Sequence, residues 1–239
     1  MSREDYEKQK VEEWIPVTVL GRKVKSGEIK SIDEIFDKGV KIKEAGIVDT
    51  LMPNIDKDLL LVGQSRGKFG GGSRRIFMQV QKKTAEGNKP KFLTLCLVGN
   101  HDGYVGIGKG KAKETLPARE KATLNAKRNI FRIARGCGSW ECGCAEHHSI
   151  PFKVTGRCGS VRVTLIPAPK GVGLCTHSEL RKILDFAGVK DVWSRIDGQS
   201  RTRMSLAGAC VSALKKLSST RVTDGLKKKT GMKVGAGNE

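Results

Sequence analysis

The chain has 239 residues, of which 38% are apolar, and its formal net charge at pH 7 is +20. This length and apolar content exclude a wholly disordered chain and suffice for one or two domains. No run approaches the roughly 20 apolar residues that a membrane helix needs, and the charged opening MSREDYEKQKVEEW does not resemble a signal peptide.

The charge is unevenly distributed. Residues 1–65 hold 11 Lys or Arg against 13 Asp or Glu, and the remainder holds 34 against 12. A folded domain with such a cationic excess attracts a polyanion, so nucleic acid is the expected partner. Solubility alone requires neither this excess nor this segregation.

The acidic-leaning residues 1–65 are expected to form an arm that packs on other elements or on a protein neighbour. A turn followed by a short apolar helix is expected in MPNIDKDLLL. The other expected elements are a polar helix over Tyr6–Trp14, a strand over Val17–Val24, a helix over Ser31–Phe36 with Ser31 as its cap, and strand or loop over Lys41–Leu51.

Residues 66–136 are expected to form a second, α+β region, opening with the glycine-rich loop QSRGKFGGGSRR. Strands over Ile76–Lys82 and Phe92–Val98, separated by the polar loop KKTAEGNKPK, and a third strand from Tyr104 make a three-stranded antiparallel meander. A helix capped by Thr115 then runs to about Arg135.

That helix has two different faces. Apolar residues at helical spacing should pack on the sheet, namely Ala118, Ala122, Ala126, Ile130 and Ile133. Basic residues at spacings of seven, four and three share another face, namely Lys121, Arg128, Arg132 and Arg135. A charged face is normally only solvated, but residues 109–135 hold nine basic and two acidic residues, so internal pairing cannot neutralise it.

A third region, residues 150–220, follows a Cys/His linker over 137–149. The expected elements are strands over Phe152–Cys158 and Ser160–Ile166, a helix over Ser178–Ala187, a strand over Asp191–Ile196 and a helix over Thr202–Leu217. Residues 221–239 are expected to be a flexible basic tail.

The segment GNHDGYVGIGKGKAKE carries closely spaced glycines, but it lacks both the dinucleotide fingerprint and the Walker pattern. Gly106, Gly108 and Gly110 fall inside the third strand, where glycine marks a bulge or the close approach of another backbone. We therefore expect a smooth strip beside Lys109, Lys111 and Lys113, along which a sugar-phosphate backbone lies.

A second basic cluster supports this interpretation. Its cations are Arg66, Lys68, Arg74, Arg75, Lys82, Lys83, Lys89 and Lys91, with Gly70, Gly71 and Gly72 as a further site of backbone approach. Aromatic residues make up only 5% of the chain, which argues against a stacking platform for single strands. Backbone and shape recognition of structured RNA fits better.

The linker packs three thiols and two imidazoles into twelve residues, in CGSWECGCAEHH. Thiolate and imidazole are ligands of tetrahedral zinc, so Cys137, Cys142, Cys144 and one of His147 and His148 make a candidate structural zinc site. The alternative is a set of buried, inert cysteines with a surface histidine. Cys96, Cys158, Cys175 and Cys210 are interpreted as small apolar residues, and no organic cofactor is expected.

Several segments resemble the universal small-subunit ribosomal protein S-five family, whose eukaryotic member is called S-two. They are GNHDGYVGIGKGKAKE, HSIPFKVTGRCGSVRVTLIPAPKGVGL and LDFAGVKDVWSR. WIPVTVLGR and IVDTLMPN look like the archaeal and eukaryotic branch, and GCGSWECGC resembles archaeal members in particular. In archaeal relatives the histidine before the S-I-P stretch accompanies the three cysteines, which points to His148.

The resemblance implies a double-stranded-RNA-binding-like domain followed by a β-α-β-α domain. It also implies a place on the cytoplasmic small subunit where head and body meet, with rRNA, mRNA near the entrance tunnel, and the S-four and S-eight proteins as partners, and a part in translational accuracy. By position, the rRNA-inserting loop of the family corresponds to Lys82–Lys91.

The residues leave one other class of function open. The four histidines accompany no nucleophile-base grouping, so an enzyme is not expected, and neither is a membrane partner. A free RNA-binding regulator would show the same charge and fold as a ribosomal protein, and only co-sedimentation with small subunits separates the two.

Overall fold

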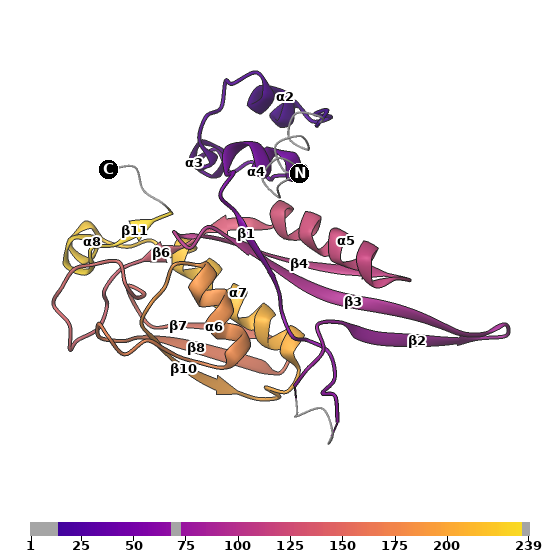
Figure 1. Ribbon diagram of the computed structural model, residues 1–239. Coiled ribbons are helices and arrows are strands. Elements are labelled where there is room, and N and C mark those ends of the chain that lie inside the picture. Colours follow the sequence, from indigo (N-terminus) through magenta and orange to yellow (C-terminus); the bar gives the residue numbers. More distant parts are fainter. Residues whose placement is uncertain (1–13, 68–72, 236–239) are drawn as a thin grey trace.

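The computed structural model describes residues 14–67 and 73–235. In Figure 1 the arm helices and α5 lie over one face of a long sheet, and α6 and α7 lie between that sheet and a second one. The predicted mixed α+β architecture with two domains is confirmed. None of the described helices combines the length and apolar content that a bilayer crossing requires.

The arm is helical. Its helices are α2 (Val19–Lys25), α3 (Ile32–Asp37) and α4 (Ala45–Leu51). The prediction of α3 is confirmed, and Ser31 forms a capping box with Glu34 at its start. The strand predicted over Val17–Val24 is wrong, and so is the strand or loop over Lys41–Leu51.

The physical reason is burial that overrides local propensity. Thr18 accepts a hydrogen bond from the N–H of Gly21 and so caps α2, while Val24, Ile47 and Val48 are buried in one apolar cluster. β-Branched residues favour strands only weakly, and packing decides the outcome. Except for Trp14, the helix predicted over Tyr6–Trp14 lies outside the described residues.

The first sheet contains β1 (Asp56–Leu59), β2 (Met78–Thr84), β3 (Gly87–Gly99), β4 (Tyr104–Ala112) and β5 (Ile130–Arg132), in the order β1-β3-β4-β5, with β2 also paired to β3. The predicted meander of β2, β3 and β4 is confirmed. The helix predicted after Pro53 is wrong, because Asp56–Leu59 pairs with the end of β3.

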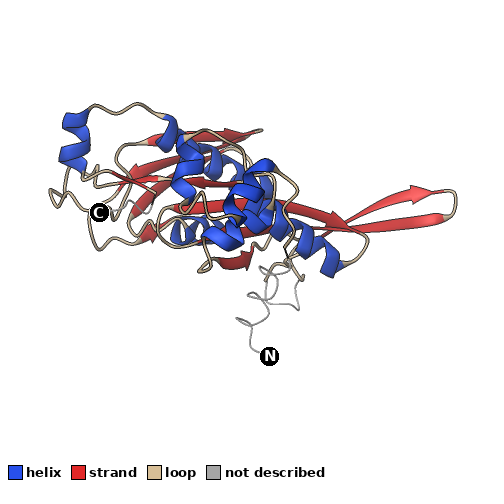
Figure 2. Ribbon diagram, turned by 90° about the horizontal axis from the view of Figure 1, so that it is seen from above, coloured by secondary structure: helices blue, strands red, loops and turns tan. Residues whose placement is uncertain are grey.

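The loop predicted over Lys82–Lys91 is also wrong. β2 and β3 stay paired until Thr84 meets Gly87, so only Ala85 and Glu86 form the turn. The resulting hairpin projects from the body of the molecule in both ribbon views (Figures 1 and 2).

Helix α5 (Thr115–Arg128) lies unusually close to β4. A Cβ atom added at Gly108 would lie 2.0 Å from the backbone nitrogen of Ala126, and one at Gly110 would lie 2.0 Å from the carbonyl oxygen of Ala118. The glycines are therefore sites of close backbone approach, as predicted, but the approaching backbone is α5. The strip expected for RNA over Gly106, Gly108 and Gly110 is wrong, since all three residues are buried.

The helix is shorter than predicted. The N–H of Asn129 closes the last turn, and the chain then pairs Ile130–Arg132 with the start of β4. Residues Ala134–Arg135 form β6. The prediction of a helix to Arg135 fails because Ile130 lies on β5 and Ile133 lies between β5 and β6, where the helical spacing no longer applies.

The second sheet has the order β7-β8-β10-β9. Its strands are β7 (Val154–Cys158), β8 (Val161–Pro167), β9 (Leu174–Cys175) and β10 (Val192–Asp197), and its helices are α6 (Ser178–Phe186) and α7 (Arg203–Ser219). The predicted hairpin, turning at Gly159 with φ +60, is confirmed, as are both helices and the later strand. Only β9 was not predicted.

Residues 221–235, the described part of the predicted flexible tail, contain regular secondary structure. They form α8 (Asp224–Thr230) and β11 (Lys233–Val234), and β11 pairs with β6. The carbonyl of Thr230 accepts a 2.7 Å hydrogen bond from the N–H of Cys137, so this segment packs on the Cys/His linker.

The second half of β3, residues 93–99, is buried on both faces. Leu95 and Leu97 belong to a cluster shared with the second domain, whereas Cys96 and Val98 belong to a cluster shared with the arm. Alternation along one strand therefore joins the two cores.

None of the seven cysteines forms a disulfide bond. Cys96 and Cys210 are buried as expected, whereas Cys175 is exposed and so does not act as an apolar core residue.

The contact of α5 with β4 predicts a specific sensitivity. Gly108→Ala forces its Cβ into the α5 backbone and should lower the free energy of unfolding by about 2–3 kcal/mol. Gly225→Ala, on α8 with open space around its Cβ, should change it by less than about 1 kcal/mol. Urea denaturation of both variants makes the comparison, and equal stability of the two would contradict the close approach.

Candidate nucleic-acid interface and metal centre

A hollow lies along the outer edge of β4, beneath α5. β5 pairs with β4 only at Tyr104–Gly106, so Ile107–Ala112 has β3 on one side and α5 near the other. Asn125 Nδ2 donates a 2.9 Å hydrogen bond to the carbonyl of Lys109 and fixes the helix to this edge. The hollow, of about 320 Å³, is lined by Lys109, Gly110, Lys111, Lys121, Leu124, Asn125 and Arg128.

A second hollow of about 550 Å³ adjoins the first. It is lined by Lys91, Lys111, Ala112, Lys113, Glu114, Pro117 and Lys121. Lys111 and Lys121 line both hollows, so the two form one surface, the basic groove. Nearby, Lys127 pairs with Asp49 and Lys89 pairs with Glu86. The cations that line the groove, by contrast, form no ion pair with any described residue. Its positive charge is thus available to an external anion.

The projecting β2–β3 hairpin carries more exposed lysines. Lys82 lies directly opposite Lys89, and Lys91 follows on the same face of the hairpin. Lys83 points to the other face. Like charges placed opposite each other are unfavourable in the free protein, and an anionic partner relieves that repulsion.

The glycine-rich loop is only partly described. Lys68, Gly70, Gly71 and Gly72 lie outside the described residues. Arg66 and Arg75 are exposed, and the backbone of Arg74 forms an isolated antiparallel β-bridge with that of Ser65. The pKa of Arg203 is lowered mainly by burial and secondly by the positive charge of Arg74. Arg74 therefore lies near Arg203 at the start of α7 rather than in the basic groove.

Two arginines that were predicted to bind RNA form ion pairs within the protein instead. Arg132 pairs with Asp37 at 2.7 Å and lies 3.9 Å from Asp33, so it joins β5 to the arm. Arg135 is only 3% exposed. It pairs with Asp102 and donates to the carbonyls of Gly188 and Gly235. Both arginines leave the helix face on which they were predicted, and Arg135 is inaccessible to RNA.

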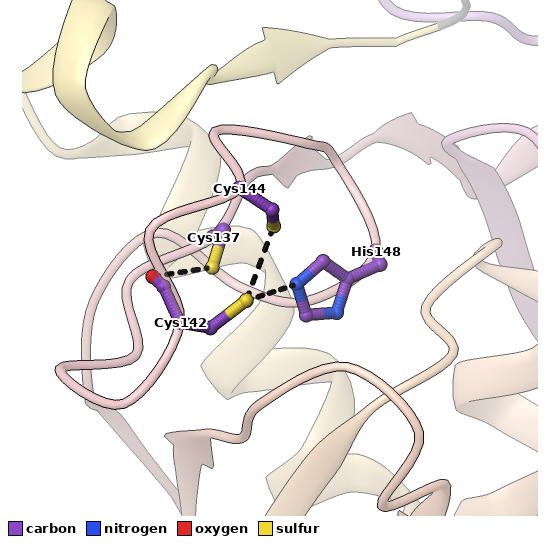
Figure 3. A group of neighbouring side chains, drawn as sticks. All are labelled: Cys137, Cys142, Cys144 and His148. Atoms are coloured by element: carbon purple, nitrogen blue, oxygen red, sulfur yellow. Dashed lines mark hydrogen bonds between the residues drawn. The ribbon is translucent and has the colours of Figure 1, made fainter.

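The linker brings four predicted metal ligands together (Figure 3). The ligand atoms of Cys137, Cys142, Cys144 and His148 all lie within 4.8 Å of one another. Cys142 Sγ is 3.2 Å from Cys144 Sγ and 3.9 Å from His148 Nε2. His147 is exposed and His148 is buried, which favours His148 as the fourth ligand.

This donor set fits zinc. In a tetrahedral site with Zn–S near 2.3 Å and Zn–N near 2.0 Å, neighbouring ligand atoms lie about 3.5–3.8 Å apart, close to the separations found. The N–H of Lys170 and then that of Cys144 lower the pKa of Cys142 to about 6, which favours the thiolate that binds metal. Burial raises the pKa of Cys137 to about 11, so metal binding there must displace a proton.

Two residues of these sites were missed from the sequence. Asn125 fixes the groove, and Asp191 binds His148 with Oδ2 2.8 Å from Nδ1. Asn125 lies between the basic positions of α5 and could have been found by helical phase. Asp191 lies 43 residues from its partner, so no local spacing indicates it.

Comparison with known proteins gives two family matches. Residues 76–134 match the N-terminal domain of ribosomal protein S5, and residues 156–228 match its C-terminal domain. The chain belongs to the ribosomal protein S5 family. The first matched domain contains most of the basic groove, and the linker with its three cysteines lies between the two matches.

Archaeal members of the S5 family match over nearly the whole chain. The protein from Nanoarchaeum equitans, named small ribosomal subunit protein uS5, is 50% identical over 89% of this chain and 91% of its own length. Proteins of the same name from Methanocaldococcus jannaschii and Thermofilum pendens are 44% and 48% identical, covering 93% and 85% of this chain and 95% and 94% of their own. The match to the Nanoarchaeum protein covers 212 of the 239 residues, so it extends into the 65-residue arm, which lies outside both matched domains.

The metal centre predicts different effects for the two adjacent histidines. Protein purified without chelators should hold one zinc per chain by atomic absorption, and His148→Ala should lower that content sharply because it removes a ligand. His147→Ala changes an exposed side chain and should leave the zinc content unchanged. Zinc well below one per chain in the unmodified protein would contradict the site.

Proposed function

We propose that this S5-family protein is a structural constituent of the cytoplasmic small ribosomal subunit and binds rRNA through the basic groove and the β2–β3 hairpin. The observation that carries the proposal is the groove itself, where cations from β3, β4 and α5 meet without internal ion pairs among the described residues. The names of the archaeal relatives support the assignment to the subunit.

The contacts are expected to be with phosphates rather than bases. The groove offers Lys and Arg side chains but no aromatic ring for stacking. Such a surface recognises the shape and backbone of folded RNA. If the groove and hairpin together neutralise six to ten phosphates, affinity falls roughly 10³- to 10⁵-fold between 50 and 200 mM salt.

We further propose the position that the family resemblance implies. The protein would lie where head and body of the subunit meet, adjoin the S-four and S-eight proteins, line the tunnel through which mRNA enters and support translational accuracy. The projecting β2–β3 hairpin supports this proposal, because two paired strands can reach between RNA segments that the compact domains cannot enter (Figure 2).

The zinc centre is proposed to be structural. Three cysteines and one histidine fill a tetrahedral site, leaving no position for a reacting water. The linker around it is hydrogen-bonded on both sides, through Gly136 to Ser149 and through Cys137 to Thr230. Bound zinc would supply a crosslink that holds these segments together. Ribosomal proteins are not a class of enzymes, and no catalytic role is proposed.

Charge reversal in the groove tests the RNA interface. Lys121→Glu combined with Arg128→Glu places negative charge in the first hollow and should weaken binding to small-subunit rRNA at least tenfold, measured by filter binding at fixed salt. The matched control, Lys30→Glu with Lys38→Glu, makes the same change in net charge on exposed positions of the arm. Equal loss in both variants would mean that only total charge matters.

Co-sedimentation separates a ribosomal constituent from a free RNA-binding regulator. A tagged chain expressed in its native cells should sediment with small subunits through a moderate salt wash, because many contacts hold it in the particle. The groove variant should shift to the light fractions, and the arm variant should not. Wild-type protein found only in the light fractions would support the regulator instead.

A further inference from the structure

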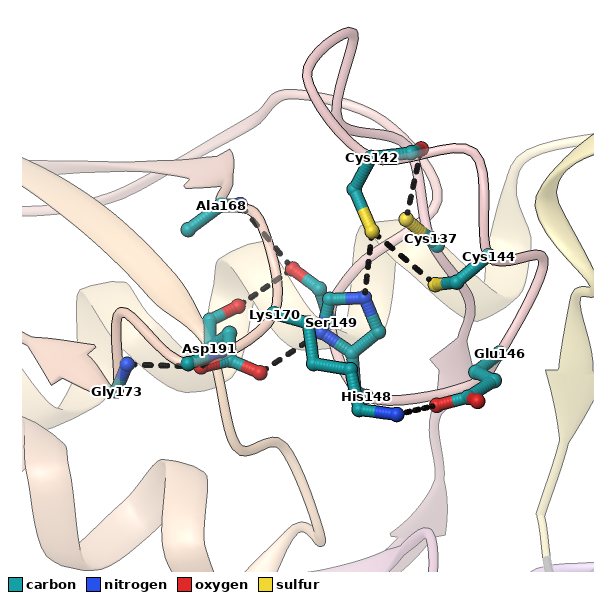
Figure 4. A network of polar contacts seen from close by, with 11 residues as sticks. Cys137, Cys142, Cys144, Glu146, His148, Ser149, Ala168, Lys170, Gly173 and Asp191 are labelled. Carbon is teal, nitrogen blue, oxygen red and sulfur yellow. Dashed lines mark hydrogen bonds and ion pairs between the residues drawn. The ribbon is translucent and has the colours of Figure 1, made fainter.

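A buried carboxylate binds His148 on the side of the ring that faces away from the thiols. Its Nδ1 lies 2.8 Å from Asp191 Oδ2, and the two side chains are only 5% and 6% exposed (Figure 4). An ionised carboxylate can only accept hydrogen bonds, so Nδ1 carries the proton. The lone pair of Nε2 is then free on the opposite side of the ring, which faces Cys142 Sγ at 3.9 Å.

The other oxygen of Asp191 binds a different segment. Oδ1 accepts hydrogen bonds from the N–H groups of Gly171 and Gly173, at 3.1 and 2.8 Å. Both glycines have positive φ, +92 and +73, so this loop has a conformation that other residues rarely adopt. Asp191 therefore links His148 to the loop over residues 168–173 (the 168–173 loop).

Ser149 strengthens the same junction. Its Oγ donates to the carbonyl of Asp191 and accepts a 3.3 Å hydrogen bond from the N–H of Ala168. The 168–173 loop also contacts the linker directly, because Lys170 Nζ donates a 2.8 Å hydrogen bond to Glu146. These contacts connect His148, the Asp191 carboxylate, the 168–173 loop and the linker that carries the thiols.

We propose that Asp191 is the positioning residue of the metal centre, which orients His148 toward the thiolates and couples metal binding to the conformation of the 168–173 loop. The inference rests on the proposed zinc centre. It also explains why a charged side chain is buried at this place, since each N–H donor among the described residues that reaches its carboxylate belongs to His148 or to that loop.

Asp191→Asn tests the assignment. Asparagine has one acceptor oxygen and one N–H₂ group, so it cannot serve both the imidazole and the loop. We expect zinc affinity, measured by competition with a chromophoric chelator on the full chain, to fall roughly 10- to 100-fold. In the wild type, zinc should slow hydrogen exchange at Gly171 and Gly173, and in the variant this protection should be lost.

Two controls separate positioning from general damage. Asp197→Asn makes the same chemical change at the far end of β10, the strand that Asp191 immediately precedes; Asp197 pairs with exposed Arg195, and the variant should keep wild-type affinity. Ser149→Ala removes the hydrogen bonds to the Asp191 carbonyl and from the Ala168 N–H, but it leaves both side chains of the contact between His148 and Asp191 in place, and should keep affinity within about threefold. Circular dichroism checks that each variant is folded; if Asp191→Asn is not, Asp191→Glu, which displaces both acceptors by one methylene, should weaken zinc binding in its place.

The outcomes are distinguishable. Unchanged zinc affinity in folded Asp191→Asn, with zinc bound by the wild type, would overturn the role of Asp191 and leave the zinc centre standing. An equal loss in Ser149→Ala would also overturn it, because loosening alone would then explain the effect. A wild type that binds no zinc would overturn the proposed centre itself, together with this inference.

Discussion

The close contact between α5 and β4 is the constraint on which the proposed interface depends. Gly106, Gly108 and Gly110 face a helix whose contacting positions are alanines, so the two backbones meet where ordinary side chains would hold them apart. This approach brings Arg128 and Lys121 on the helix beside Lys109 on the strand edge. With the helix farther from the sheet, these cations would be scattered over separate surfaces and would not line one groove.

The cationic excess serves two purposes in this fold. Some cations join distant segments, as Arg135 does by binding Asp102 and two backbone carbonyls, and as Lys127 does by pairing with Asp49 on the arm. These charges are paired with carboxylates of the same chain and so do not neutralise RNA phosphates. The cations of the groove form no ion pair with the described residues, and among the hairpin lysines Lys89 pairs with Glu86. The distinction between the two groups follows from burial and ion pairing, not from sequence.

The sequence predicted what local patterns determine. The meander, α6 and α7 follow from periodicity. The three candidate cysteine ligands and one of two adjacent histidines follow from the spacing of thiols and imidazoles in a short linker, whereas the choice of His148 came from the family resemblance. In the arm, α3 was predicted from its cap, but α2 and α4 were not, because their apolar residues are placed by contacts with one another and with the first sheet. Arg132 was misplaced because helical phase was extended past Asn129, where the chain leaves α5. Asp191 carries no local signature at all, since only the fold brings it to His148.

The central claim is that the groove between α5 and β4 holds folded rRNA. A density map of the small subunit containing this protein tests it most directly. We expect phosphate groups within hydrogen-bonding reach of Lys109, Lys121 and Arg128, with the β2–β3 hairpin inserted among RNA segments. A map in which that groove faces solvent or another protein, with no RNA beside it, would contradict the account.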